Sequence, residues 1–235
     1  MSSIKLAPLY DKKVVCLYCA KEFTSKQVRS SAVKMIKQDS DYCTYYQGEN
    51  PLYYDVFVCP YCGFAFTSTF SRLTPANRQT LEKEYFAKLP AIPDLCHNRN
   101  IHQALQAYKW AALTSYLVGE KSIITANLFL RIAWLYRYQN LPGQEKRYLA
   151  KALRFYEDAY AREDVEEVMD EHQLLFLMGD IYTRLDQYHK ALKVFSMLFT
   201  DPSVPPKIRA RAKDSWTKYK EKQKKETSSK KSPVV

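Results

Sequence analysis

Glycine is scarce in this chain, with five residues among 235, at positions 48, 63, 119, 143 and 179. They are too far apart to form the glycine-rich loop that cradles a phosphate group. The HExxH motif of zinc proteases and the GxSxG motif of serine hydrolases are also missing. None of the four histidines stands in a sequence pattern typical of a catalytic triad or a metal site; they are His97, His102, His172 and His189. We therefore expect a protein that is not an enzyme.

Long apolar runs are missing too. The longest candidate, residues 122–138, is interrupted by Asn127 and Arg131, and a membrane-spanning helix needs about 20 predominantly apolar residues. The first residues, MSSIKLAPLYDKK, contain no apolar stretch typical of a secretory signal. The sequence therefore predicts a cytoplasmic protein that does not cross a membrane.

Positive charge is concentrated near the C-terminus. Residues 207–235 carry +8 of the net charge of +11, so the rest of the chain is nearly neutral. A basic patch shared by several predicted elements, as in many nucleic-acid-binding domains, is not visible in the sequence. Binding of nucleic acid through the cysteine motifs and this basic tail is our alternative interpretation of the function.

Four of the six cysteines form two pairs with the same spacing, Cys16-x2-Cys19 and Cys59-x2-Cys62. A turn of this kind places two thiolates on one side, and two such turns supply the four ligands of a tetrahedral zinc ion. The 39 residues between the pairs exceed the usual spacing of about 15 to 20. Neither pair lies in a βαβ pattern typical of a redox dithiol. The sequence predicts one structural zinc per chain, and four cysteine ligands leave no coordination position for a catalytic water.

Four segments, taken in order, resemble a known family. They are CLYCAKEF, VRSS, DSDYCTYYQGENPLYYDVFVCPYCGFAF and LCHNRNIHQALQAYKWAAL. Over residues 13–220 the chain resembles the bacterial family catalogued as domain of unknown function 2225. The resemblance implies that Cys16, Cys19, Cys59 and Cys62 are the metal ligands, and that Cys43 is a recurring cysteine. It implies an architecture and no activity.

Cys43 and Cys96 remain outside the predicted zinc site. Cys43 is interpreted as a core or loop thiol, since structural zinc sites are almost always four-coordinate. It could instead replace one of the four ligands or act as the nucleophile of a thiol enzyme, although Asp41 nearby disfavours a thiolate. Cys96 is expected to pack in the core, and a metal site at Cys96 and His97 is the weaker alternative.

From Thr74 onward the sequence predicts helices. Thr74 and Pro75 are a typical N-cap and first helical residue, opening a helix to about Lys88. A pattern of a small residue, an aromatic four positions on, and a small or apolar residue three positions further occurs three times. These positions are Ala104, Tyr108 and Ala111; Ala152, Tyr156 and Ala159; and Ala191, Phe195 and Leu198. The spacing is typical of the second helix of a tetratricopeptide repeat, and Gly179 and Tyr182 match the first helix of the last copy.

The predicted fold is α+β, a small zinc-ribbon-like β module followed by a tetratricopeptide-like array of helical hairpins. We expect a flexible leader (1–12), the zinc module (13–72), the helical domain (73–219, with a capping helix from Lys207 to Glu221) and a disordered basic tail (220–235). The predicted function is that of an adaptor that binds a protein or peptide segment in a helical groove. The candidate groove contacts are Tyr136, Arg137, Tyr182 and Arg184. The acidic segment 157–171 is a solvated face or a docking site for a basic ligand.

Overall fold

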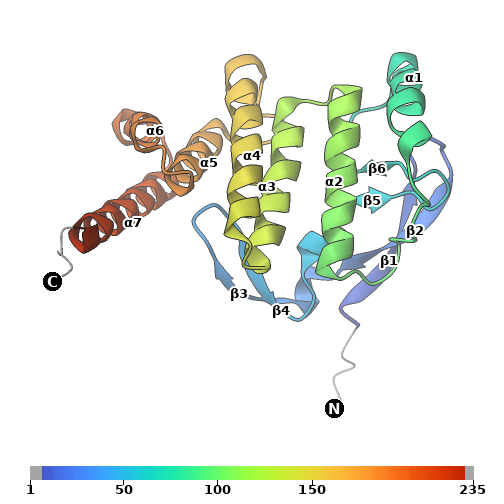
Figure 1. Ribbon diagram of the computed structural model, residues 1–235, viewed down its shortest axis with the longest axis horizontal. Helices are drawn as coiled ribbons and strands as arrows, with labels where there is room; N and C mark the ends of the chain where they lie inside the picture. Colours follow the sequence, from blue (N-terminus) through green and yellow to red (C-terminus); the bar gives the residue numbers. More distant parts are fainter. Residues whose placement is uncertain (1–6, 231–235) are drawn as a thin grey trace, which may run out of the picture. The chain divides into compact units, whose positions relative to one another are not determined.

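The computed structural model describes the backbone of residues 7–230 and side chains as far as Glu221. The chain divides into two compact units. The N-terminal unit comprises Met1–Asp39 and Cys43–Ala152, and the C-terminal unit comprises Ser40–Tyr42 and Leu153–Val235. Strands occupy the first part of the chain and helices the rest, so the predicted α+β class is confirmed (Figure 1).

Three antiparallel two-stranded sheets form the β part of the N-terminal unit. β1 (Leu9–Val15) pairs with β2 (Glu22–Val28), β3 (Lys34–Gln38) with β4 (Thr44–Gln47), and β5 (Phe57–Val58) with β6 (Ala65–Phe66). Short 3-10 helices lie at Ser30–Ala32 and Pro51–Tyr54. Because β1 begins at Leu9, the predicted leader extends into a paired strand; its residues 1–6 lie outside the described part of the chain.

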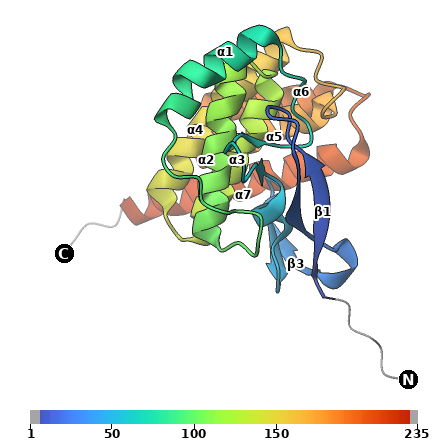
Figure 2. The same ribbon diagram turned by 90° about the vertical axis from the view of Figure 1, so that its right-hand side faces the viewer.

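The helices of the N-terminal unit are α1 (Pro75–Glu84), α2 (Ile101–Val118), α3 (Ser122–Tyr138) and the first half of α4 (Pro142–Arg162). Thr74 caps α1 as predicted, accepting a hydrogen bond from the Asn77 amide, and the helix ends earlier than expected, followed by a 3-10 turn at Phe86–Lys88. α1 packs against α2 and α2 against α3 (Figures 1 and 2).

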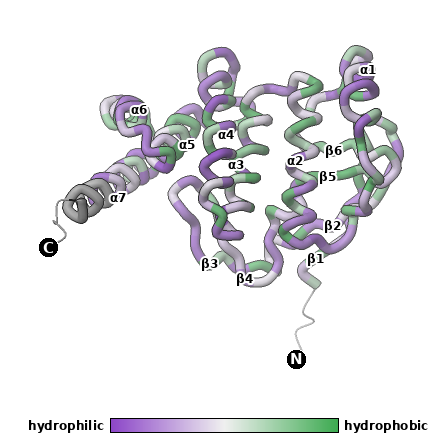
Figure 3. The backbone as a smooth tube through the Cα atoms, in the orientation of Figure 1, coloured by the Kyte–Doolittle hydropathy of each residue, from purple (hydrophilic) through white to green (hydrophobic). Residues whose placement is uncertain are grey.

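The β part and these helices share one core. α2 packs against β6, and the Thr114 hydroxyl donates a hydrogen bond of 2.6 Å to the Ala65 carbonyl oxygen. The short strands β5 and β6 are fully buried and hydrophobic (Figure 3). The predicted domain boundary at residues 72 and 73 therefore falls inside a compact unit, because strands this short need the helix surface to bury their side chains.

The C-terminal unit is built from the second half of α4, α5 (Glu171–Arg184), α6 (Tyr188–Thr200) and α7 (Pro206–Lys230). α5 packs closely on α6, since a Cβ atom on Gly179 would lie 2.6 Å from the Phe195 ring. α7 continues past the predicted end at Glu221, through part of the segment expected to be disordered. Lys, Glu and Gln are strong helix formers, which explains this extension. The last five positions of the predicted tail, 231–235, are outside the described residues.

The recurring helical pattern correctly identifies core positions. All nine of its residues have no exposed surface; they are Ala104, Tyr108, Ala111, Ala152, Tyr156, Ala159, Ala191, Phe195 and Leu198. They lie on α2, α4 and α6, which alternate along the chain with α3 and α5. Small residues at these positions permit close helix packing, and the aromatic residue fills the space beside them.

Within the part of the chain that the structure describes, every helix is too short or too polar to cross a lipid bilayer.

Candidate metal centre

Each cysteine pair lies in a tight turn, and the two turns have the same backbone hydrogen bonds. We call residues 16–21 the first knuckle and residues 59–64 the second. In the first, the Ala20 amide donates to the Cys16 carbonyl at 3.0 Å; in the second, the Gly63 amide donates to the Cys59 carbonyl at 2.8 Å. Ala20 and Gly63 both have positive φ, +59° and +76°. This left-handed residue turns each chain back, so that the preceding two sulfurs face the same side.

The two knuckles bring all four predicted ligands together. The sulfur atoms of Cys16, Cys19, Cys59 and Cys62 lie within 4.8 Å of one another. Cys16 and Cys62 sulfurs are 3.7 Å apart, and Cys19 and Cys59 sulfurs are 3.6 Å apart. Four sulfurs bound at about 2.3 Å to a tetrahedral zinc ion lie about 3.8 Å from each other. The residues therefore fit a closed four-thiolate metal site, with Cys16 and Cys59 buried and the other two half-buried.

The packed sulfurs also perturb one another's ionisation. Hydrogen bonds from Cys16 and Cys62 lower the pKa of Cys59, whereas the hydrogen bond to Cys59 raises the pKa of Cys16. The pKa of Cys62 is raised, chiefly by its hydrogen bond with Cys16. Four sulfurs this close cannot all ionise without a cation between them. A divalent metal ion is the group that stabilises four thiolates in so small a space.

α1 and its C-cap residue, Tyr85, are bonded to the two knuckles. The Arg78 guanidinium donates to the carbonyl oxygens of Tyr18 and Leu17, at 2.5 and 3.2 Å, in the first knuckle. The buried Tyr85 hydroxyl donates to the Gly63 carbonyl oxygen, at 2.8 Å, in the second. Burial raises the pKa of Tyr85, so its hydroxyl remains a donor. These contacts fix the two knuckles relative to the same helix.

A family model described as "Uncharacterized protein conserved in bacteria (DUF2225)" matches residues 9–219. The chain belongs to this family. No curated protein and no solved structure matches it in the corresponding searches. The membership confirms the resemblance found in the sequence. This DUF2225 protein has a β region that contains the four-cysteine cluster, and helices follow it along the chain.

Arg99 is a buried residue that sequence analysis did not single out. Its guanidinium donates to the carbonyl oxygens of Leu95, Tyr53 and Val56, at 2.6, 3.1 and 2.7 Å. The acceptors include the turn that leads into the second knuckle, and Arg99 itself lies in the segment LCHNRN. One side chain thus joins two of the segments that carry the family resemblance. The sequence neighbours of Arg99 are the polar residues Asn98 and Asn100, so no local signal showed that Arg99 is buried.

The remaining cysteines lie outside the cluster. Cys96 is buried, its sulfur lies 3.7 Å from the Val58 carbonyl oxygen, and burial raises its pKa to about 12, so it packs as a neutral thiol. His97, 75% exposed, contacts Asp94 at 3.0 Å and adds no ligand to a second site in the described chain.

Cys43 is completely buried and lies near two tyrosines. The pKa values of Tyr45 and Tyr138 are raised, first by burial and then by the nearby Cys43. The Cys43 carbonyl oxygen accepts a hydrogen bond of 2.8 Å from the Asp39 amide. This environment fits the interpretation of Cys43 as a core thiol rather than as a fifth metal ligand.

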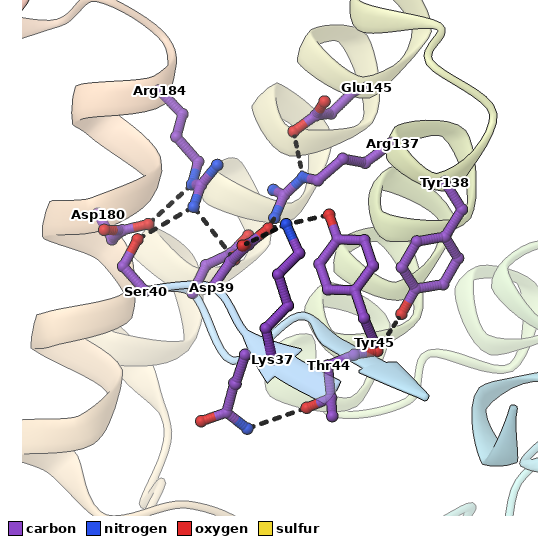
Figure 4. Close-up of polar contacts among 12 residues, drawn as sticks. Lys37, Asp39, Ser40, Thr44, Tyr45, Arg137, Tyr138, Glu145, Asp180 and Arg184 are labelled. Carbon is purple, nitrogen blue, oxygen red and sulfur yellow. Dashed lines mark hydrogen bonds and ion pairs between the residues drawn. The ribbon is translucent and has the colours of Figure 1, made fainter. Parts of the chain in front are cut away.

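The four predicted groove contacts are engaged in internal interactions, and Figure 4 shows those of Arg137 and Arg184. In the N-terminal unit, Arg137 pairs with Asp39 at 2.9 Å and with Glu145 at 2.8 Å, and Tyr136 stacks on a neighbouring ring. In the C-terminal unit, Arg184 forms an ion pair with Asp180 at 2.8 Å, and the Tyr182 hydroxyl donates a hydrogen bond to Glu157. These side chains therefore stabilise their own unit. The sequence prediction missed this because the spacing of residues does not show which face of each helix is covered by other parts of the chain.

Other residues line an open groove of about 340 Å³ on α2, α3 and the start of α4. They are Lys109, Ala112, Leu113, Tyr116, Phe129, Ile132, Tyr148 and Lys151. Leu113 and Tyr116 are 44% and 67% exposed. The Lys151 ammonium lies 5.2 Å from the centre of the Tyr148 ring, and the lining contains no acidic residue. The groove combines an apolar floor with positive charge, a combination that the sequence did not predict.

The acidic segment 157–171 is largely used within the C-terminal unit. Asp170 caps α5 by accepting from the Gln173 amide at 2.8 Å, and Asp158 pairs with Arg162 at 2.9 Å. Glu157 contacts Lys190 at 3.7 Å. These contacts support the interpretation of the segment as capping and surface residues.

Proposed function

We propose that this DUF2225 protein is a non-catalytic cytoplasmic adaptor that binds a segment of another protein in the groove on α2, α3 and α4. The observation that carries the proposal is this groove, open to solvent and lined by exposed apolar side chains between two lysines. Exposed apolar surface rimmed by polar groups is typical of an interaction site.

In this proposal the metal is a structural zinc ion. Four cysteine ligands complete the tetrahedral coordination of zinc and leave no position for a substrate or a water molecule. The metal would stabilise the two knuckles, and through them the core shared with α2. The chain's own residues then provide recognition, and no bond is made or broken.

Charge complementarity indicates the chemistry of the partner. Lys151 lies 5.4 Å from the ring centre of Phe129 and 5.2 Å from that of Tyr148, so its ammonium group stands over two rings of the groove, and Lys109 adds a second positive charge to the lining. An extended or helical segment with a leucine or aromatic side chain and flanking carboxylates would bury the floor and pair with both lysines.

The helices support a tetratricopeptide-like interpretation. The pairs α1 and α2, α3 and α4, and α5 and α6 would be three helical hairpins, with α7 as the capping helix. The close contact of Gly179 with Phe195 matches the tight packing of such hairpins. Each hairpin would bury its own small and aromatic positions.

A random peptide library displayed on phage tests the function. Panning on the zinc-loaded full chain should enrich acidic peptides with an apolar anchor. A Lys109→Glu and Lys151→Glu double variant should bind them at least about tenfold more weakly, because two attractive charges become repulsive. A Lys83→Glu variant changes an exposed lysine on α1 outside the groove, and should bind as the unaltered protein does.

Enrichment of basic peptides would refute the proposed groove. So would an equal loss of peptide affinity in the double variant and in Lys83→Glu. Tight binding of an oligonucleotide that weakens linearly in log K with log salt, and is lost on deletion of residues 220–235, would favour the nucleic-acid alternative instead.

A further inference from the structure

A second pocket, of about 560 Å³, lies beside the metal centre in the same unit. The knuckles contribute Tyr18, Tyr61 and Cys62 to its lining, and the helical side contributes Glu82 from α1 and Phe86 from the turn that follows it. The pocket is open, and Tyr61 at its rim is 56% exposed. It shares no residue with the groove of the proposed function.

Negative charge gathers in this pocket. The Glu82 carboxylate accepts a hydrogen bond of 3.1 Å from the Tyr18 hydroxyl, and within the described residues it forms no ion pair. Cys62 belongs to the four-cysteine cluster, which with zinc bound to four thiolates would carry a net charge of −2. A carboxylate and a thiolate centre that line the same pocket favour a cation over an anion or a neutral group.

The walls of the pocket are aromatic. The rings of Tyr18 and Phe86 lie 4.4 Å apart between centroids, inclined at 45°. The protein's own cations already approach such rings: the Lys21 ammonium lies 4.9 Å from the centre of Tyr61, and the Arg78 guanidinium 5.4 Å from that of Tyr18. Arg78 is held by backbone carbonyls, and Lys21 is exposed and long. These two cations offset part of the negative charge of the pocket. The Glu82 carboxylate and the Phe86 ring are then available to bind a third cation from outside the chain.

We propose that this pocket binds an alkylammonium group, the side chain of a lysine presented by another protein. The ammonium would form a charge-assisted hydrogen bond with the Glu82 carboxylate, and its alkyl chain would contact Phe86 and Tyr18. Small-molecule sites gain most of their affinity by burying the ligand's surface. This open pocket would enclose little of a small free amine, so it is poorly suited to one. A protein-borne lysine gains further contacts at the rim, where Tyr61 and Ile92 are exposed.

The test is a titration of the zinc-loaded full chain, followed by ¹⁵N-resolved NMR. The probes are a blocked tripeptide with a central lysine, the same peptide with norleucine, and n-butylammonium. We expect the lysine peptide to shift resonances of the second knuckle and of α1. Glu82→Gln should weaken its binding about tenfold or more, the effect of removing the charge from one hydrogen-bonded ion pair.

Two further variants sharpen the result. Glu84→Gln, on the same helix, removes a carboxylate that already pairs with Lys88 at 2.6 Å, and should leave the affinity unchanged. Lys21→Ala removes a competing cation and should strengthen binding. Equal binding of the norleucine peptide, absence of shifts with the lysine peptide, or equal affinity in Glu82→Gln would overturn the proposal. Equal affinity for n-butylammonium would overturn the assignment to a protein-borne lysine.

Discussion

The two knuckles differ at the residue with positive φ, and this difference predicts opposite effects of two substitutions. Ala20 adopts φ +59° in the first knuckle, and Gly63 adopts φ +76° in the second. The left-handed conformation costs an L-residue about 1 to 2 kcal/mol, whereas glycine adopts it freely. We therefore expect Ala20→Gly to stabilise the protein and Gly63→Ala to destabilise it.

The magnitudes follow from the surroundings. For Ala20→Gly, the relieved strain is partly offset by the greater backbone entropy of glycine in the unfolded chain, about 0.5 to 1 kcal/mol, so the net gain is about 0 to 1.5 kcal/mol. A Cβ atom on Gly63 would lie 2.4 Å from Leu89 Cδ2 and 3.1 Å from Ile92 Cγ1. Displacing these side chains adds an overpacking cost, so Gly63→Ala should cost about 1.5 to 4 kcal/mol in total.

Urea unfolding of the zinc-saturated variants, followed by circular dichroism, measures both changes. The slope with denaturant should stay constant, so that the midpoint reports the change in unfolding free energy. Free zinc is kept at one saturating concentration, because a bound metal shifts the apparent stability. A stabilised Gly63→Ala variant, or an Ala20→Gly variant that loses more than about 1 kcal/mol, would refute the equivalence of the two turns.

Three other changes follow from particular contacts. Cys59→Ser should lower the zinc content from one ion per chain to none after dialysis against a weak chelator, and one zinc still bound would contradict the four-ligand site. Gly179→Ala should cost about 1 to 3 kcal/mol of unfolding free energy, because its Cβ would meet Phe195, whereas Gly143→Ala, with no neighbour within 4 Å, should be neutral or slightly stabilising. Arg99→Met should cost about 3 kcal/mol or more, since three carbonyl oxygens would lose their donor in the core; a fully stable variant would show that water replaces the guanidinium.

The cluster of four cysteines was predictable from the sequence because the pattern that forms it is local. A Cys-x2-Cys spacing followed by a residue able to turn the chain specifies half a site without any knowledge of the fold. The helical core positions were predictable for the same reason, since Ala191 and Phe195 lie four residues apart on one helical face. In both cases the periodicity or spacing within a few residues contains the information.

The domain boundary and the groove contacts were not predictable in this way. Whether Arg137 faces a partner or Asp39 depends on a residue about a hundred positions away, and the charge on a side chain does not reveal its partner. The zinc module was expected to be separate from the helices, but Thr114 on α2 bonds to Ala65 in β6. Contacts between distant segments decide both points, and no local pattern encodes them.

The position of α1 shows how the metal centre would influence the rest of the unit. α1 has ten residues, fewer than the about 12 to 15 that an isolated helix needs to be stable in water. Its stability must come from its contacts, and Arg78 and Tyr85 bond it to the two knuckles that hold the cysteines. Loss of the metal would free the knuckles to separate, and these two side chains could then no longer bond to both at once. The four thiolates, α1 and the pocket beside Glu82 should therefore form and unfold together, so that hydrogen exchange of the α1 amides should rise with the first addition of a zinc chelator.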